Sequence, residues 1–152
     1  MRGSNQQRVL AVASSGGHWV QLRRLAPAFE GQDVAYITTD PGHRSEVGAA
    51  RFYVVNDANR WNKLAVLRCA LKIAATMLRE RPTVVISTGA APGYLAIRCA
   101  RLLRARTVWI DSVANVDELS MSGRLASGTA DLCLTQWPHL AGGNVRYLGA
   151  VL

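Results

Sequence analysis

Two short runs of small residues in the sequence could bind an anionic group. The first covers residues 14–17 and the second residues 87–93, and each follows an apolar run. Glycine lets the backbone approach a ligand closely, and the free N–H groups at the start of a helix favour phosphate. The alternative is that both runs are tight turns between a strand and a helix. The residues that we expect to face an anion are Ser14, Ser15, Gly16, Gly17, Thr88 and Gly89.

Two titratable side chains stand beside such positions. His18 follows the first run, and Asp111 follows an apolar run. An imidazole, whose ordinary pKa is near neutrality, or a carboxylate can take a proton from a hydroxyl group. The alternatives are that His18 only forms a hydrogen bond within its loop and that Asp111 caps a helix or pairs with an arginine. The chain contains neither G-x-G-x-x-G nor G-x-x-x-x-G-K-[ST], so neither standard nucleotide-binding loop is predicted.

The elements that must position these residues alternate along the chain. Strands are expected at residues 8–13, 33–38, 52–55, 83–87, 106–110, 131–135 and 145–148. Helices are expected at residues 18–30, 61–81 and 92–103, with a long loop and one helical turn at residues 113–128. This alternation predicts a single α/β domain over residues 1–152, Rossmann-like, with a mostly parallel sheet and helices on both faces. Residues 1–7 are expected to be a polar tail, of which 1–4 resemble an expression tag.

The predicted sheet places the candidate residues together. Ligands of open parallel sheets bind beyond the carboxyl ends of the strands. The two small-residue runs, residues 39–45, residues 111–123 and residues 136–138 all follow predicted strands. We therefore expect one crevice to be lined by several of these loops.

The charge of the chain favours anionic partners. Eighteen Lys and Arg residues against ten Asp and Glu give a net charge of +8. The long helix predicted at residues 61–81 combines apolar stripes with a basic strip. This strip is either the solvated face of a helix packed on the sheet or a surface that contacts anionic lipid. The basic strip consists of Arg68, Lys72 and Arg79.

Several classes of protein are not supported. No apolar stretch reaches the roughly 20 residues that a membrane-spanning helix needs, and no signal peptide is recognisable. Cys69, Cys99 and Cys133 lie far apart, so we expect reduced thiols and no metal site. Basic residues do not interleave with aromatic ones as in single-strand binders, and no helix-turn-helix pattern occurs, so nucleic acid is not an expected partner.

Five stretches taken together resemble a known family. They are VLAVASSGGHWVQL (residues 9–22), VVISTGA (84–90), VWIDSVANVDELSMSGRL (108–125), ADLCLTQWPHL (130–140) and RYLGAVL (146–152). In this order they resemble the acceptor-side subunit of split GT-B glycosyltransferases. The eukaryotic member is the membrane-anchoring subunit of the two-chain UDP-GlcNAc transferase of dolichol-linked oligosaccharide synthesis, and bacterial relatives serve capsule and exopolysaccharide assembly.

The resemblance implies the N-terminal half of a GT-B glycosyltransferase. This half would bind a lipid-diphosphate-sugar acceptor, while a separate donor-binding glycosyltransferase subunit would hold the UDP-sugar. The chain would then bind no cofactor or metal tightly and would be inactive without its partner. It would lie as a peripheral protein on the anionic membrane surface, at the cytoplasmic face of the inner membrane.

The resemblance also implies roles for single residues. His18 or Asp111 would be the catalytic base, and Arg124 would join the small-residue runs in contacting acceptor phosphate. The residues expected near the cleft and the partner are Gln136, Trp137 and Gly149, with residues 149–152 helping to dock the partner. The chain departs from the family pattern with Asp111 in place of Glu, Asn115 in place of Arg and Gln21 in place of an acidic residue.

Two other functions fit the same sequence. The chain could be a non-catalytic enhancer or scaffold that recruits a glycosyltransferase to lipid. It could also be a stand-alone nucleotide-binding Rossmann protein. Substitutions in the cleft that abolish activity while the two chains still associate would argue against a scaffold, and binding of UDP-sugar by this chain alone would argue for the stand-alone protein.

Overall fold

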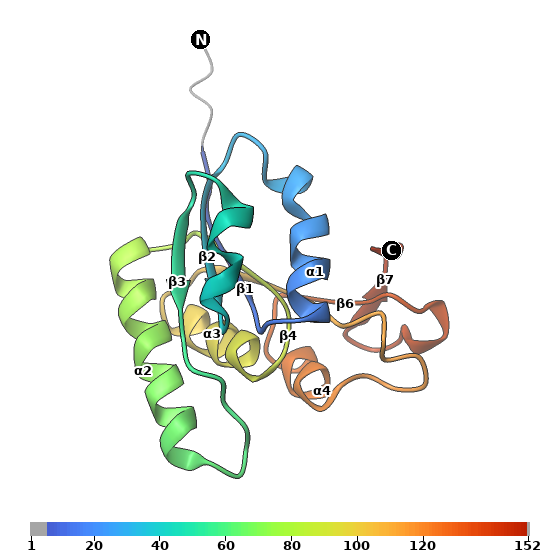
Figure 1. Cartoon of the computed structure of the whole chain (residues 1–152). Helices are drawn as coiled ribbons and strands as arrows, with labels where there is room; N and C mark the ends of the chain where they lie inside the picture. Colours follow the sequence, from blue (N-terminus) through green and yellow to red (C-terminus); the bar gives the residue numbers. More distant parts are fainter. Residues whose placement is uncertain (1–5, 152) are drawn as a thin grey trace.

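One parallel sheet forms the centre of the molecule. In the computed structural model, which describes residues 6–151, seven strands lie in the order β3-β2-β1-β4-β5-β6-β7, and all neighbours are parallel (Figure 1). The strands are β1 (Arg8–Ala13), β2 (Asp33–Thr38), β3 (Arg51–Val54), β4 (Val84–Gly89), β5 (Arg106–Ile110), β6 (Leu132–Thr135) and β7 (Val145–Tyr147). The order reverses direction between β1 and β4, where open sheets of this kind have their ligand crevice.

Helices connect the strands and cover both faces of the sheet. The α-helices are α1 (Gly17–Arg24), α2 (Lys63–Glu80), α3 (Ala91–Leu102) and α4 (Met121–Ser127). The 3-10 helices are η1 (Ala26–Phe29), η2 (Pro41–Val47) and η3 (Pro138–Leu140). The α2 helix begins after Asn62, whose side chain accepts a hydrogen bond from the Ala65 N–H, and ends at Glu80, with Arg81 as the C-terminal cap just before Pro82.

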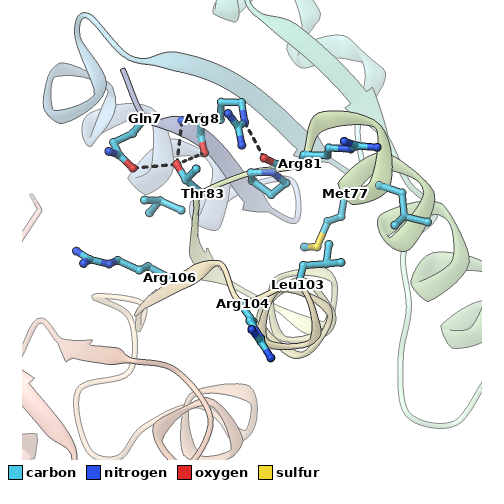
Figure 2. Close-up of a pocket in the computed structure, with 11 residues that line it drawn as sticks. Gln7, Arg8, Met77, Arg81, Thr83, Leu103, Arg104 and Arg106 are labelled. Atoms are coloured by element: carbon cyan, nitrogen blue, oxygen red, sulfur yellow. Dashed lines mark hydrogen bonds between the residues drawn. The ribbon is translucent and has the colours of Figure 1, made fainter. Parts of the chain in front are cut away.

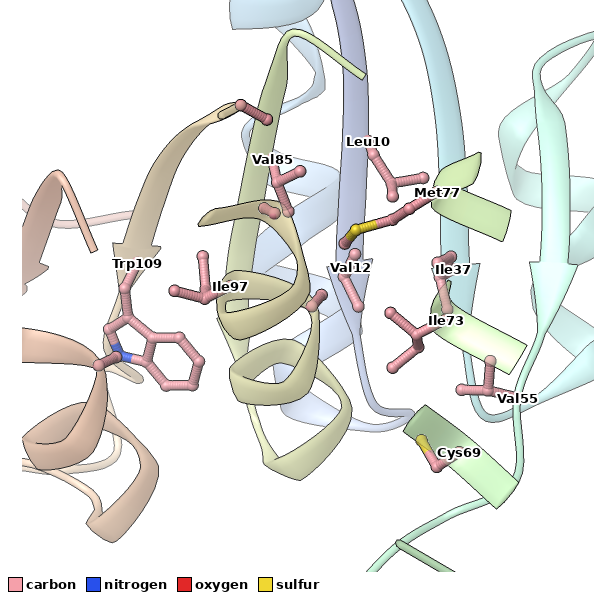
Figure 3. Packing of buried hydrophobic residues seen from close by; sticks show 14 of the residues in the cluster. Leu10, Val12, Ile37, Val55, Cys69, Ile73, Met77, Val85, Ile97 and Trp109 are labelled. Atoms are coloured by element: carbon pink, nitrogen blue, oxygen red, sulfur yellow. The ribbon is translucent and has the colours of Figure 1, made fainter. Parts of the chain in front are cut away.

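Two apolar layers make the core, one on each face of the sheet. Because side chains alternate along a strand, β1 contributes to both layers. On one face Leu10 and Val12 pack against Ile73 of α2 and Ile97 of α3 (Figure 3). The other layer consists of Val9, Ala11, Ala13, Trp19, Leu22, Phe29, Tyr36 and Val47, which places α1 on the opposite face from α2 and α3. The predicted Rossmann-like α/β fold, with a mostly parallel sheet and helices on both faces, is confirmed.

The helix predicted at residues 18–30 is wrong in its second half. The α-helix ends at Arg24, and a separate 3-10 helix, η1, follows. Pro27 has no N–H to donate to the carbonyl four residues earlier, so the α-helical pattern cannot continue through it.

Two loops contain more structure than the sequence predicts. The segment after β2 forms η2, and the Asp40 side chain accepts a hydrogen bond from the Gly42 N–H at its start (2.8 Å). Within the loop predicted at residues 113–128, α4 takes seven residues rather than one turn. The Ser120 side chain caps α4 by accepting a hydrogen bond from the Gly123 N–H (2.8 Å).

The expectations for the ends of the chain are only partly covered. The tag-like residues 1–4 and the last residue of the segment 149–152 lie outside the described residues. Gln6 and Gln7, predicted to belong to the polar tail, bond to the turn before β2. The Gln6 side chain donates to the Gly31 carbonyl (3.3 Å), and the Gln7 N–H donates to the Gln32 side chain (2.7 Å).

Candidate functional site

The two small-residue loops meet where the sheet order reverses. The Ser14 N–H, just after β1, donates a hydrogen bond to the Gly89 carbonyl at the end of β4 (3.2 Å). The Thr88 hydroxyl donates to the backbone carbonyl of His18 (2.7 Å), so the start of α1 is fixed to β4. The structure therefore brings together Ser14, His18, Thr88 and Gly89, as the sequence predicts from the parallel sheet.

A second hydrogen bond orients the His18 imidazole. Its Nδ1 lies 2.9 Å from the Thr88 carbonyl oxygen. A carbonyl can only accept, so we assign the proton to Nδ1, which leaves the lone pair of the neutral ring on Nε2. This is the tautomer that a general base needs, and His18 is only half-buried.

Glycine is required at position 89 for this arrangement. A Cβ atom there would lie 2.4 Å from the His18 Nδ1, far inside van der Waals contact. Gly89 also has a φ of +125°, which side-chain-bearing residues rarely adopt. The second small-residue run thus makes room for the histidine that follows the first.

Trp19, which follows His18 in the chain, anchors α1 to η2. It is 1% exposed, and its indole N–H donates to the Glu46 carboxylate (2.8 Å). The His43 ring stacks on it at 4.7 Å and bonds to the same carboxylate (2.6 Å). The hydrogen bond from His43, followed by that from Trp19, holds the Glu46 pKa below its usual value. This contact with η2 fixes the rotation of α1 and hence the direction of His18.

Both helices that follow the two small-residue loops lack a side-chain cap. Gly16 precedes α1 and Ala90 precedes α3, and no side-chain hydrogen bond caps either helix. Ser15, Gly16 and Gly17 are exposed. The Ser15 N–H donates a hydrogen bond to the Thr39 hydroxyl oxygen (3.0 Å). Helix N-termini of this kind leave backbone N–H groups for an anionic ligand.

Asp111 is a buried hub of hydrogen bonds. It is 2% exposed, and its carboxylate accepts from four donors. The donors are the Trp109 indole N–H (3.1 Å), the Asn115 amide (3.1 Å), the Ser120 N–H (2.9 Å) and the Ser120 hydroxyl (2.6 Å). With its oxygens engaged, Asp111 organises the loop before α4, and the predicted role as a base stays a prediction.

Two buried glutamines join α1 to the carboxyl ends of β5 and β6. The Gln136 amide donates to the Gln21 side-chain oxygen (2.5 Å) and to the Asp111 carbonyl (2.9 Å). Gln21 in turn donates to the Ser112 hydroxyl (3.0 Å). The side-chain oxygen of Gln136 accepts the Val151 N–H (2.7 Å), so this residue holds the end of the described chain.

The remaining candidates are spread over other parts of the surface. Trp137 donates from its indole N–H to the Val113 carbonyl (2.8 Å), next to the glutamine pair, and Gly149 is exposed in the C-terminal segment. Arg124 bonds to the Glu118 carboxylate (2.8 Å) and not to either small-residue loop in the described structure. The basic strip of Arg68, Lys72 and Arg79 lies exposed on α2, across the sheet from α1.

Sequence reasoning missed several residues that build the site. Gln21 attracted attention only as a departure from a family pattern, yet it links α1 to the loop after β5. Ser120 and Asn115 escaped notice as partners of Asp111. The spacing of Ser120 before a Gly and an apolar run was a usable signal for a helix cap. The bonds of Gln21 join residues 91 and 115 positions apart, which no local pattern encodes, whereas Asn115 bonds to a residue only four positions earlier.

The described residues offer neither a metal site nor a membrane-spanning helix, and the buried cysteines are poorly ionised. Residues 6–151 contain no group of three or more His, Cys, Asp or Glu placed to hold a metal ion. Within the same range no helix has the length and apolar character to cross a membrane. All three cysteines are free thiols, and burial raises the pKa of Cys69 to about 11 and of Cys133 to about 12.

Solved structures with a similar fold include GT-B proteins. MurG from Acinetobacter baumannii superposes with a TM-score of 0.76 at 16% sequence identity, over 93% of this chain and 45% of the MurG chain. The UDP-N-acetylglucosamine 2-epimerase from Rickettsia bellii has a TM-score of 0.69 at 12% identity, over 94% of this chain and 44% of its own. The chain thus corresponds to somewhat less than half of each of these proteins, and the fold is that of one GT-B domain.

Sequence comparison identifies the family within this fold class. Residues 54–151 match the family described as "Oligosaccharide biosynthesis protein Alg14 like". The UDP-N-acetylglucosamine transferase subunit ALG14 of Eremothecium gossypii is 26% identical over 180 residues, which cover 96% of this chain and 80% of that protein. Its namesake from Yarrowia lipolytica is 33% identical over 69 residues, or 41% of this chain and 32% of that protein. The chain belongs to the Alg14-like family of oligosaccharide biosynthesis proteins.

Proposed function

We propose that the chain is the acceptor-side subunit of a two-chain UDP-sugar-dependent glycosyltransferase. In this function it binds a lipid-diphosphate-sugar acceptor and recruits a separate donor-binding chain to the membrane. Support comes from the family, from two relatives named as transferase subunits, and from a fold that superposes on 45% of the MurG chain. Because both relatives are named for UDP-N-acetylglucosamine, this is the first donor to test.

The observation that carries the proposal is the pairing of His18 with the two uncapped helix starts. The N–H groups at the start of α1 and α3 suit the acceptor diphosphate. The acceptor hydroxyl attacks the anomeric carbon of the donor, its proton goes to the His18 Nε2, and the bond to the UDP oxygen breaks so that UDP leaves with the electron pair. A positioned base of this kind contributes roughly 10²–10⁴-fold to the rate.

The other candidate residues then have supporting tasks. Asp111 positions the loop before α4, and Gln136 holds the C-terminal segment against α1. Trp137 and Gly149 lie on the side where the donor-binding partner would dock. Arg124 would contact phosphate by giving up its ion pair with Glu118. This ion pair is exposed and therefore contributes little stability.

We assign membrane contact to the exposed face of α2. Trp61 is 81% exposed, and Leu64, Leu67 and Leu71 continue the apolar face along α2. The basic strip of Arg68, Lys72 and Arg79 flanks these side chains, which is the composition of a helix that lies in a bilayer surface. The chain would then bind peripherally to anionic lipid at the cytoplasmic face of the inner membrane.

Donor binding separates this function from its alternatives. The native partner is obtained by affinity purification of the chain from the membrane fraction and mass spectrometry, and titration calorimetry then measures UDP-N-acetylglucosamine binding. We expect the chain alone to bind no donor and the complex to bind it. Donor binding by the chain alone would instead indicate a stand-alone nucleotide-binding protein. If the chain is only a scaffold, His18→Ala should leave the rate of sugar transfer by the complex unchanged. Val20→Ala on the same helix is the control and should leave this rate unchanged in either case.

A further inference from the structure

A basic cavity opens at the end of the molecule opposite the candidate site. It has a volume of about 910 Å³ and is walled by the first residues of β1, β4 and β5 and by the ends of α2 and α3 (Figure 2). His18 follows the carboxyl end of β1, whereas Arg8 begins the same strand. The cavity and the candidate site therefore lie at opposite ends of β1.

Four arginines surround this cavity. They are Arg8, Arg81, Arg104 and Arg106, and none of the described residues that line it is acidic. Figure 2 shows Arg8 and Arg81 on one side and Arg104 and Arg106 on the other. Arg8 uses its Nε to donate to the Arg81 carbonyl (2.7 Å). Within residues 6–151 the guanidinium groups of Arg81, Arg104 and Arg106 form no hydrogen bond or ion pair, so their charges are free for an anion.

Two of these arginines occupy backbone positions that normally favour glycine. Arg81 caps the carboxyl end of α2 with a φ of 46°, and Arg104 follows α3 with a φ of 56°. They are the only non-glycine residues with positive φ in the described part of the chain. Helices most often end with glycine in this conformation, because a side chain makes it strained. Strain at two positions that line the same cavity and both carry a free guanidinium group points to a function for the side chains.

The cavity continues into an apolar groove. A groove of about 130 Å³ between α2 and α3 shares Met77, Leu78 and Leu103 with the wall of the cavity. Its rim residue Leu102 is 85% exposed, and Leu78 belongs to the same α2 face as Leu71. Free guanidinium groups beside exposed leucines match a ligand with an anionic head and apolar chains. A soluble phosphate has the anionic group but no apolar chain.

We infer that this cavity binds the phosphate headgroup of an anionic phospholipid, with the acyl chains against Leu78, Leu102 and Leu103. The inference rests on the proposed contact of α2 with a bilayer and adds a specific headgroup site at one end of that helix. It gives the bilayer contact a fixed orientation, because the headgroup site holds the carboxyl end of α2 and Trp61 holds the other end.

Vesicle flotation of the purified full chain tests this site. The vesicles are pure phosphatidylcholine, or phosphatidylcholine in which about a third of the lipid is phosphatidylglycerol. One variant combines Arg81→Gln, Arg104→Gln and Arg106→Gln. Its control combines Arg24→Gln, Arg44→Gln and Arg146→Gln, which removes the same charge from exposed positions elsewhere. We expect the cavity variant to partition onto anionic vesicles about ten-fold more weakly than the control.

A second variant uses the backbone strain. Arg81→Gly with Arg104→Gly removes both side chains while relieving the strained conformations. We expect it to melt no lower than the parent chain and yet to lose most of its binding to anionic vesicles. A loss of binding without a loss of stability separates a headgroup site from a structural role.

Four outcomes would overturn the inference. Equal weakening of cavity variant and control would show that only total charge matters. Binding of soluble glycerophosphate that depends on the cavity, with vesicle binding unchanged, would identify a site for a free anion. The cavity variant could bind vesicles as the parent does, while a variant with Leu67→Gln and Leu71→Gln loses binding. In that case the proposed headgroup site is wrong, but the bilayer contact of α2 is supported. A parent chain that binds no vesicle contradicts both.

Discussion

Asp111 and His18 stand at the same edge of the sheet, but their surroundings suit different tasks. His18 is half-buried, and one ring nitrogen is held by a carbonyl, which leaves the other for proton transfer. Asp111 accepts four hydrogen bonds and is almost inaccessible. A carboxylate that is engaged in this way stabilises its donors first of all.

The first prediction concerns the stability that Asp111 provides. Asp111→Asn keeps the shape of the side chain but turns one acceptor oxygen into a donor, which then faces N–H or O–H donors. We expect the free energy of unfolding to fall by about 2–4 kcal/mol, as for other broken buried networks. Urea unfolding measures this. A variant that is as stable as the parent but inactive would favour Asp111 as the catalytic base.

The second prediction concerns the cysteines. Burial raises the pKa of Cys69 to about 11, raises the pKa of Cys99, and raises that of Cys133 to about 12. The reactive thiolate is therefore scarce at pH 8 in the folded chain. We expect iodoacetamide to label all three thiols slowly in the native protein and rapidly in urea, as counted by mass spectrometry. Fast native labelling of Cys69 or Cys133 would contradict the buried positions.

At the scale of elements, the loop after β4 depends on a residue without a side chain. Gly89→Ala would place a Cβ 2.4 Å from the His18 Nδ1 at a φ of +125°. This third prediction is a loss of about 2 kcal/mol or more in unfolding free energy, together with a displaced imidazole.

The control for this prediction is Gly128→Ala. Gly128 has an ordinary negative φ of −88°, and a Cβ there meets no heavy atom closer than 3.9 Å. It should unfold within a few tenths of a kcal/mol of the parent. If Gly89→Ala were equally harmless, the close contact between β4 and His18 would not be required for the fold.

The sequence predicts the strands better than the connections. The bounds of β1, β2 and β5 agree with the prediction residue by residue, because short β-branched runs between turn residues are a strong local signal. The end of α1 was missed although Pro27 is visible in the sequence. The site was predicted as far as the sheet topology brings its loops together, whereas the bonds of Gln21, Gln136 and Asp111 link residues from distant parts of the chain.

The α2 helix shows where pattern reading reaches its limit. Its sequence carries two apolar stripes, and either could face the sheet. The structure buries Cys69, Ile73 and Met77 and leaves the stripe that contains Leu67 and Leu71 in solvent. Which stripe packs depends on the fit against β1 and β2, and this fit is not visible in the hydrophobic period.

At the scale of the whole molecule, two ends of one sheet have different chemistry. The carboxyl end holds His18 and two uncapped helix starts, and the amino end holds four arginines around a cavity. The α2 helix runs between these ends for 18 residues, a length of about 27 Å. If its exposed face lies on a bilayer, the two small-residue loops at the carboxyl end stay close to the membrane surface, where a lipid-linked acceptor presents its diphosphate.

The fourth prediction, and the most direct test, is sugar transfer by the reassembled complex. The chain and its donor-binding partner, alone and mixed, receive UDP-N-acetylglucosamine and lipid-diphosphate-sugar acceptor, and labelled product is counted in the lipid fraction. We expect transfer only from the mixture, and His18→Ala to lower its rate roughly 10²–10⁴-fold while the complex keeps its mass and its unfolding midpoint. Transfer by this chain alone, or a His18→Ala complex as fast as the parent, would contradict the assignment of acceptor-side catalysis to this subunit.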